Sequence, residues 1–412
     1  MKNYIDYNKL CPTIKGQLYS SNNNIIPVII TYKTDKKLKE GKISSLSRQL
    51  KCNLPIVNGC SCEMSISSIL EMTADPDVEF ICYDAKVFAT MDIARKTIGA
   101  DLVYNTGYTG KNVTVAIIDT GISPHADLVY PTNRVVGFKD FVNNETRMYD
   151  DNGHGTHCAG ILAGNGYASK GKYKGIAPEA NILSIKVLDE NGNGNTSDIL
   201  STVQWIVDNK EVYKTRIINF SLGAIAQHRE RRDPLVKAAN KAIDNNLIVI
   251  AAVGNSGPLK NTILSPATSR HVISVGALDD KRTPDLKDIA IAEFSSRGPT
   301  LDKVKKPDLI TPGVNIMSTS NTNLGSYTSL SGTSMSAPMV SGAAALLLNE
   351  NPNYTHFDIK RKLLRACSKI RASAFDQGAG VLDINKIFSW DKGSDFCSSL
   401  YLCIMIRLYL YP

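Results

Sequence analysis

Three short stretches of the chain carry side chains that can act as acid, base and nucleophile. "VAIIDTG" contains Asp119, "DDNGHGTHCAG" contains His154, and "SGTSMSAP" contains Ser334. A serine hydroxyl is a weak nucleophile unless a base takes its proton and an acid orients that base. A fourth stretch, "AAVGNSG", offers Asn255, whose amide can donate a hydrogen bond to a developing oxyanion. These four side chains predict nucleophilic serine chemistry if the fold brings them together.

Each of these side chains also has an ordinary structural interpretation. Asp119 can bond the turn that follows it, Ser334 can be a plain helix N-cap, and Asn255 can lie in a turn. Each segment alone is therefore weak evidence. The chemistry depends on the elements that position the four residues.

Two neighbours of His154 need separate interpretation. His157 follows three residues later, and an H-x-x-H spacing can bind a metal ion. The H-E-x-x-H pattern of zinc peptidases is absent, so we predict no metal here and expect His157 to pack in its helix. Cys158 is expected to be a buried thiol of low reactivity.

Five apolar runs rich in β-branched residues recur between residues 113 and 278. Such runs are typical of strands buried on both faces of a parallel sheet. Between them lie predicted helices, for which Thr196 or Ser197 and Asp233 are the expected caps. This alternation predicts an α/β fold: a doubly wound parallel sheet with flanking helices. The runs are 113–119, 181–188, 216–222, 247–255 and 271–278, and the helices are 196–209 and 233–246.

The expected sheet would bring distant residues together, because sites in such folds lie at the carboxyl ends of the strands. Asp119 ends the first run and Asn255 ends the fourth. Ser334 precedes a long stretch of small and apolar residues, which predicts a turn entering a buried helix. The free N–H groups and the positive dipole end of that helix suit an oxyanion beside Ser334.

A small α+β domain is expected to precede the sheet. Within it we expect strands at 25–32 and 78–87, short helices at 43–50 and 66–73, and a further strand within 53–64. The expected division of the chain is a polar lead-in at 1–24, the small domain at 25–90, the α/β domain at 91–390 and an apolar tail of unassigned role at 391–412.

Composition and charge narrow the classes of function. The chain has a net charge of +8, but its basic stretch at 358–371 lacks the interleaved aromatic residues of a nucleic-acid site. We expect no nucleic-acid partner and, without an apolar run of about 18 residues, no membrane span. The start of the chain lacks the apolar core of a secretory signal. The nine cysteines are scattered in the manner of free thiols, so a cytoplasmic location is expected.

Seven segments of the chain resemble the motifs of the subtilisin-like serine proteases, in the family order aspartate, histidine, serine. By this resemblance Asp119, His154 and Ser334 form the triad, and Asn255 and the Ser334 N–H hold the oxyanion. The similarity is strongest to the intracellular, alkaline bacterial type. It implies a serine endopeptidase that cleaves proteins or peptides through an acyl-enzyme. The segments are "VAIIDTGISPHADL", "DDNGHGTHCAG", "INFSLG", "AAVGNSGP", "FSSRGP", "KPDLITPGVNI" and "SGTSMSAP".

The same resemblance implies a cleft in which a substrate peptide lies as an added β-strand between two extended edges. A wall of the first specificity pocket follows, with Ser256 and Leu264 near its far end. No acid is placed there, which favours apolar or neutral P1 residues. The implied edge residues are Gly192 and Gly194 on one side and Ser221, Leu222 and Gly223 on the other, and the wall residues are Ala252, Val253 and Gly254.

The small domain resembles the family's propeptide, a folding chaperone and inhibitor, which implies a zymogen that cleaves itself between about 87 and 92. A permanently attached domain is the alternative. A different class of function, a catalytically silent binding or signalling module of the same fold, would normally lack a triad residue. No cofactor is expected. A structural calcium ion has no assigned ligands, although Asp150 and Asp151 could either bind an ion or begin the histidine helix.

Overall fold

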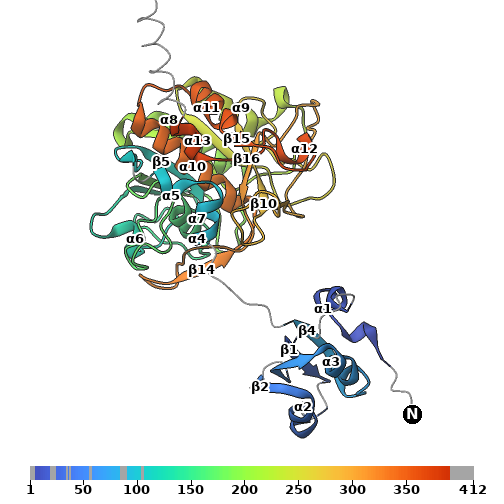
Figure 1. Cartoon of the computed structure of the whole chain (residues 1–412). Helices are drawn as coiled ribbons and strands as arrows, with labels where there is room; N and C mark the ends of the chain where they lie inside the picture. Colours follow the sequence, from blue (N-terminus) through green and yellow to red (C-terminus); the bar gives the residue numbers. More distant parts are fainter. Residues whose placement is uncertain are drawn as a thin grey trace, which may run out of the picture. The chain divides into compact units, whose positions relative to one another are not determined.

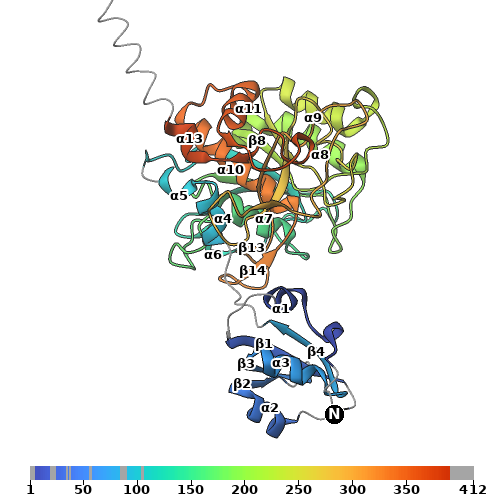
Figure 2. The ribbon, with the colours of Figure 1, turned by 45° about the vertical axis from the view of Figure 1, so that its right-hand side comes forward.

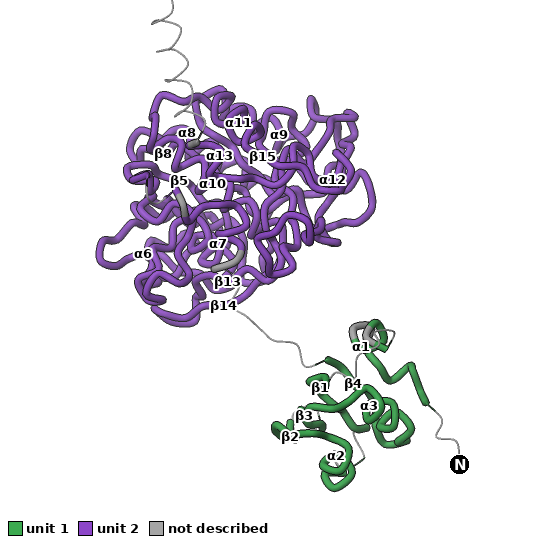
Figure 3. Tube along the Cα trace, viewed as in Figure 1, with its two compact units in different colours: residues 1–88 green, residues 89–412 purple. Residues whose placement is uncertain are grey.

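The computed structural model describes residues 5–18, 25–33, 36, 39–54, 58–83, 91–103 and 106–389. The chain divides into two compact units, residues 1–88 and 89–412 (Figure 3). The apolar tail at 391–412 lies outside the described residues, as does most of the expected cleavage segment at 87–92. In the described part, no helix is both long enough and apolar enough to span a bilayer.

The first unit contains an antiparallel sheet in the order β2-β3-β1-β4, together with helices α1, α2 and α3 (Figure 1). Leu10 and Ile14, expected within a polar lead-in, are buried in its core. The expected helix at 43–50 is half wrong: it ends at Leu46, because the residues after it pair with β3 as a strand. The elements are η1 Tyr7–Lys9, α1 Pro12–Gln17, β1 Ile25–Tyr32, α2 Glu40–Leu46, β2 Ser47–Leu54, β3 Gly59–Ser65, α3 Ile66–Thr73 and β4 Val78–Tyr83.

The second unit is built on a ten-stranded sheet in the order β15-β16-β12-β10-β9-β8-β5-β7-β6, with β11 paired to β10. Neighbours from β6 to β16 are parallel, and only β15 and β11 of this sheet run antiparallel to their neighbours. A separate hairpin joins β13 and β14. The strands are β5 Thr114–Asp119, β6 Val135–Asp140, β7 Asn181–Lys186, β8 Thr215–Phe220, β9 Ile248–Ala252, β10 Ile273–Asp279, β11 Ala290–Ile291, β12 Leu309–Pro312, β13 Ile316–Thr319, β14 Tyr327–Leu330, β15 Cys367–Ser368 and β16 Val381–Leu382.

Helices cover both faces of this sheet, which confirms the predicted doubly wound fold (Figure 2). Val115 and Ile117 of β5 pack in the core that contains α7 and α10, whereas Ala116 and Ile118 pack in the core that contains α8 and α9. The helices are α4 Met91–Thr97, α5 Ala100–Val103, α6 Ala126–Val129, α7 His154–Ala163, α8 Thr196–Tyr213, η4 Glu230–Arg232, α9 Pro234–Asp244, α10 Thr333–Glu350, α11 His356–Arg365, α12 Ala374–Gln377 and α13 Ile384–Ser389.

The helix caps are partly as expected. Asp233 caps α9 by accepting the N–H groups of Leu235 and Val236, as predicted. Neither Thr196 nor Ser197 caps α8, because the N-cap position belongs to Asn195.

The strand order places β5 at a reversal of direction. The chain passes from β5 to β6 and β7 on one side and then to β8, β9 and β10 on the other. Such a reversal opens a crevice at the carboxyl end of the sheet. Asp119, the last residue of β5, lies at that point.

Candidate active site

Asp119 and His154 form a direct pair at the carboxyl end of the sheet. His154 Nδ1 lies 2.7 Å from Asp119 Oδ1, which also accepts the Thr120 N–H at 2.8 Å. The Asp119 side chain is only 1% exposed, whereas that of His154 is 26% exposed. The pair engages Nδ1 of the imidazole and leaves Nε2 to take a proton from a serine.

The surroundings of His154 favour its charged form. Burial alone would lower the pKa of His154, because it disfavours the imidazolium. The negative charge of Asp119 outweighs burial and holds the pKa well above the ordinary value of 6.5. Burial also raises the pKa of Cys158, so that thiol is neutral and we attribute the shift of His154 to Asp119. The site therefore stabilises the imidazolium that forms when histidine acts as a base.

Asp150 fixes the start of the histidine helix. Its Oδ1 accepts the Gly153 N–H at 2.8 Å, and its Oδ2 accepts the N–H and hydroxyl of Thr156 at 2.9 Å and 2.6 Å. Asp151 instead forms an ion pair with Lys186 at 2.6 Å. Of the two acids that could have bound an ion, one therefore begins the helix and the other binds an ammonium group.

Ser334 lies in the first turn of α10, as the sequence predicts. Its Oγ donates a hydrogen bond to the Ser221 carbonyl at 2.8 Å, and in the described structure it makes none with His154. The Cys158 thiol connects the two, because Sγ lies 3.9 Å from His154 Nδ1 and donates to the Ser334 carbonyl at 3.4 Å. A bond between nucleophile and base commonly tightens only when substrate binds.

Asn255 is oriented by the residue before the serine. Its side-chain oxygen accepts the N–H and the hydroxyl of Thr333, both at 2.9 Å. The amide nitrogen therefore points elsewhere, and a Cβ built on Gly332 would lie 3.3 Å from it. Asn255 is exposed, and its amide nitrogen lies beside Gly332, the N-cap residue of α10.

His157 and Cys158 are both buried in α7. His157 Nε2 contacts the carbonyls of Ile316 at 2.9 Å and Thr328 at 3.2 Å, which ties the helix to the β13–β14 hairpin. Burial lowers the pKa of His157 to about 3. The second histidine is therefore a neutral packing residue, as predicted.

A cleft of about 530 Å³ runs beside His154. Thr120, Asn152 and Leu188 line it together with both predicted substrate edges. The cleft places five of the predicted substrate residues beside the base: Gly192, Gly194, Ser221, Leu222 and Gly223.

The residues of the predicted wall of the first specificity pocket do not line this cleft. Ala252 and Val253 are buried, at 4% and 0% exposure. Gly254 packs against Leu264, because a Cβ on Gly254 would lie 2.4 Å from Leu264 Cγ. A second cavity of about 230 Å³ contains Leu264 and Ser256 in its lining. Leu264 therefore fills the space beside the backbone of Gly254.

Among the described residues, one group of metal-ligating side chains comes together: Asp119, His154 and Cys158, with ligand atoms within 4.8 Å of one another. Metal ligands must be deprotonated. Here the Cys158 thiol donates a hydrogen bond, and His154 Nδ1 is engaged by Asp119. The arrangement fits an acid–base pair rather than a metal site.

A doubly wound parallel sheet with an aspartate–histidine pair and a helix-terminal serine at its carboxyl edge defines the architecture of a serine endopeptidase. The chain belongs to the subtilase family, whose sequence model matches residues 110–380.

Individual relatives agree with this membership. Serine protease AprX of Bacillus subtilis (strain 168) is 41% identical over 341 residues, which cover 78% of this chain and 76% of that protein. Subtilisin E of the same strain is 32% identical over 84% of each chain. The solved structure of sphericase aligns with a TM-score of 0.59 at 28% identity, over 69% of this chain and 97% of that one. The predicted family, fold class and serine endopeptidase activity are thus confirmed.

Two further residues organise this site and were not predicted from the sequence. Thr333 orients Asn255, and its position directly before Ser334 was the available signal. Lys186 is a completely buried lysine at the end of β7. Its signal was a charged residue inside the apolar run at 181–188, where a strand buried on both faces leaves no route to solvent.

Proposed function

We propose that Ser334 is the nucleophile of this endopeptidase and that His154 is its general base. Asp119 orients His154 and stabilises its imidazolium. The 2.7 Å contact of Asp119 with His154 carries this assignment. His154 takes the proton of Ser334 as its Oγ attacks the scissile carbonyl, and then gives that proton to the leaving amine. Water, activated by the same histidine, releases the acyl group and restores the serine.

Asn255 and the Ser334 N–H are the proposed donors to the oxyanion. The fixed orientation of the Asn255 amide supports this role, because a preorganised donor needs no rearrangement as charge develops. The substrate backbone would lie between the edges at Gly192–Gly194 and Ser221–Gly223 as an added strand.

Casein hydrolysis by purified wild-type protein and by Ser334→Ala tests this assignment. We expect the variant to lose roughly a millionfold in turnover, the scale known for the serine of a subtilisin triad. Comparable activity of the two proteins would reject Ser334 as the nucleophile. An inactive wild type would favour the silent binding module.

The first unit is proposed to be a propeptide that the catalytic unit removes. Its separate core and its four-stranded sheet support a domain that folds as a unit. Mass spectrometry of the active protein should find a new N-terminus near 87–92, whereas Ser334→Ala should keep the full chain. A fully active wild type with an intact N-terminus would contradict self-cleavage and favour a permanently attached domain.

We also propose a cytoplasmic location. Six cysteines of the described residues form no disulfide, which suits a reducing compartment: Cys11, Cys52, Cys60, Cys62, Cys158 and Cys367. Fractionation of the source cells should recover the protein with cytoplasmic markers, and recovery from the medium would contradict the proposal.

We propose that the side chain preferred at P1 is small, and apolar or neutral. Leu264 packs between Gly254 and Gly223, where a Cβ on Gly223 would lie 2.9 Å from Leu264 Cβ. A side chain entering between these two glycines would meet the leucine.

A further inference from the structure

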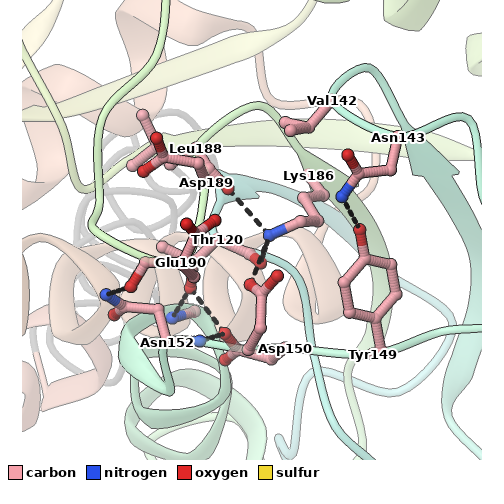
Figure 4. A network of polar contacts seen from close by, with 12 residues as sticks. Thr120, Val142, Asn143, Tyr149, Asp150, Asn152, Lys186, Leu188, Asp189 and Glu190 are labelled. Atoms are coloured by element: carbon pink, nitrogen blue, oxygen red, sulfur yellow. Dashed lines mark hydrogen bonds and ion pairs between the residues drawn. The ribbon is translucent and has the colours of Figure 1, made fainter.

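Lys186 is the last residue of β7 and is completely buried. Burying an ammonium group is costly unless its charge is paired and its N–H groups are bonded. Lys186 Nζ donates to the Thr120 carbonyl and to the Leu188 carbonyl, each at 2.8 Å (Figure 4). It also donates to Asp151 Oδ1 at 2.6 Å. Three acceptors match the three N–H groups of an ammonium. The ring of Tyr149 lies 5.0 Å from Nζ and adds a cation–π contact.

The three acceptors belong to three different parts of the active site. Thr120 directly follows Asp119, and Asp151 lies three residues before His154. Leu188 lines the cleft and begins the chain segment that continues to Gly192 and Gly194. One ammonium group therefore contacts the residue after Asp119, the turn before His154 and one edge of the substrate cleft.

Hydrogen bonds between uncharged groups accompany the three contacts of Lys186. The Asp119 carbonyl accepts the N–H of Val187 at 2.9 Å. Asn152 Nδ2 donates to the Glu190 carbonyl at 2.9 Å (Figure 4). Asn152 Oδ1 accepts the His154 N–H at 3.1 Å. Asn152 thus links the cleft edge to the first residue of α7. The Lys186–Asp151 pair is the charged contact within this network.

We propose that Lys186, with Asp151 as its partner, is a positioning residue that couples the Asp119–His154 pair to the cleft edge at 188–194. Neither residue takes part in the proposed proton transfers. The inference rests on the proposed function, because coupling has a kinetic meaning only if Asp119 and His154 are catalytic. Without the ammonium, the three segments lose their common partner and shift independently.

The consequence depends on the length of the substrate. A peptide that extends along the cleft contacts the edge at 188–194, whereas a short ester need only reach Ser334 and His154. A displacement of about 1 Å at a reacting group can cost on the order of a hundredfold in rate. Loss of Lys186 should therefore reduce cleavage of long peptides more than cleavage of a short ester. A lysine that only stabilises the fold would change neither rate per active site.

The experiment compares wild type with Lys186→Met, which keeps the length of the side chain without its charge, and with Lys186→Arg. Active sites are counted by titration with a serine-directed label, so that misfolded protein does not enter the rates. kcat and KM are measured for p-nitrophenyl acetate and for a tetrapeptide p-nitroanilide. Lys306→Met is the matched control, because Lys306 is equally buried and its partners, the Val272 carbonyl and Asp308, do not line the cleft.

For Lys186→Met we expect kcat/KM on the tetrapeptide to fall by about 100-fold and on the ester by less than about 10-fold. Lys186→Arg should recover part of the loss, and Lys306→Met should keep both rates per active site. Equal losses on the two substrates, or unchanged rates per site, would overturn the coupling. A wild type that cleaves neither substrate would instead reject the proposed function.

Asp151→Asn keeps the proposal testable if Lys186→Met does not fold. The Asp151 side chain is 32% exposed, and asparagine keeps an oxygen acceptor while it removes the charge. We expect the same substrate-length dependence with a smaller loss, of about 5- to 10-fold on the tetrapeptide. Unchanged kinetics of Asp151→Asn together with an unfolded Lys186→Met would assign Lys186 to folding alone.

Discussion

The side-chain oxygen of Asn255 accepts both hydrogen-bond donors of Thr333, each at 2.9 Å. Thr333 Oγ1 in turn accepts the N–H of Gly254 at 3.1 Å, so the segment that carries Asn255 and the helix that carries Ser334 are bonded at the same point. The amide nitrogen of Asn255 is thereby left as a fixed donor before any substrate arrives. This arrangement makes the roles of the two residues separable by mutation.

Asn255→Ala should lower kcat by about 100- to 1,000-fold with little change in KM, because the lost hydrogen bond forms only in the transition state. Thr333→Val removes one of the two bonds that orient the amide and should have a smaller effect in the same direction. Steady-state kinetics on a tetrapeptide p-nitroanilide measure both. A rise in KM at constant kcat would place Asn255 in ground-state binding instead.

The pH dependence of kcat/KM should reveal the influence of Asp119 on His154. The base must be neutral, and its pKa is raised, so activity should fall as the pH drops through a midpoint above 6.5. Asp119→Asn removes the attraction while burial remains, so its midpoint should shift to lower pH and its rate should fall about 10,000-fold. A wild-type midpoint at or below 6.5 would contradict this electrostatic account.

The same pair has a consequence for stability. A raised pKa in the folded state means that the contribution of the pair to the free energy of unfolding is fully present below the ordinary histidine pKa. That contribution is lost as the pH rises through the raised value. In Asp119→Asn this pH dependence of the free energy of unfolding should disappear. Denaturant unfolding curves at several pH values measure it, with both proteins either fully inhibited or carrying Ser334→Ala.

Mercury compounds should inhibit the enzyme through Cys158. Its Sγ contacts both His154 Nδ1 at 3.9 Å and the Ser334 carbonyl at 3.4 Å, so a bound mercury atom would displace the base from the serine. Burial raises the pKa of the thiol, so alkylating reagents that need the thiolate should react slowly. Residual casein activity after mercuric chloride measures the effect.

Two variants separate Cys158 from the other thiols. Cys158→Ser should resist mercury, whereas Cys367→Ser, which alters the other described thiol of the second unit, should remain sensitive. Equal inhibition of wild type and Cys158→Ser would show that mercury acts elsewhere.

Leu264 should limit the size of the P1 side chain. Leu264→Ala opens the space between Gly223 and Gly254, so kcat/KM for a phenylalanine P1 should rise relative to an alanine P1 by about 10-fold, the scale of a methylene or two in a pocket. A matched pair of peptide substrates that differ only at P1 measures the ratio. An unchanged ratio would place the P1 side chain away from Leu264.

Much of the second unit could be predicted because its strands are continuous apolar runs. The run at 113–119 corresponds to β5 at Thr114–Asp119, and the run at 181–188 to β7 at Asn181–Lys186. The weaker strand β6 was missed because only its two ends, Val135 and Asp140, are buried and its pattern is therefore not apolar. The helix expected at 43–50 failed at Ser47, where pairing with the next strand, β3, outweighs local preference.

At the site, order along the chain identified the residues that could do chemistry, but not the contacts that hold them. Motif spacing pointed to Asp119, His154, Ser334 and Asn255 without indicating how the amide of Asn255 is turned. That orientation depends on hydrogen bonds between residues 78 apart in the chain. The bond of Ser334 to the Ser221 carbonyl likewise depends on three-dimensional packing.

Mapping the adduct of a fluorophosphonate label tests the central claim, activation of Ser334 by His154, most directly. Wild-type protein is labelled, digested and sequenced by tandem mass spectrometry, beside His154→Ala treated in the same way. We predict a single adduct on Ser334 that forms rapidly in wild type and at least about 1,000-fold more slowly without the histidine. A protein that cleaves casein but carries its adduct on another residue, or labels equally fast without His154, would contradict the account.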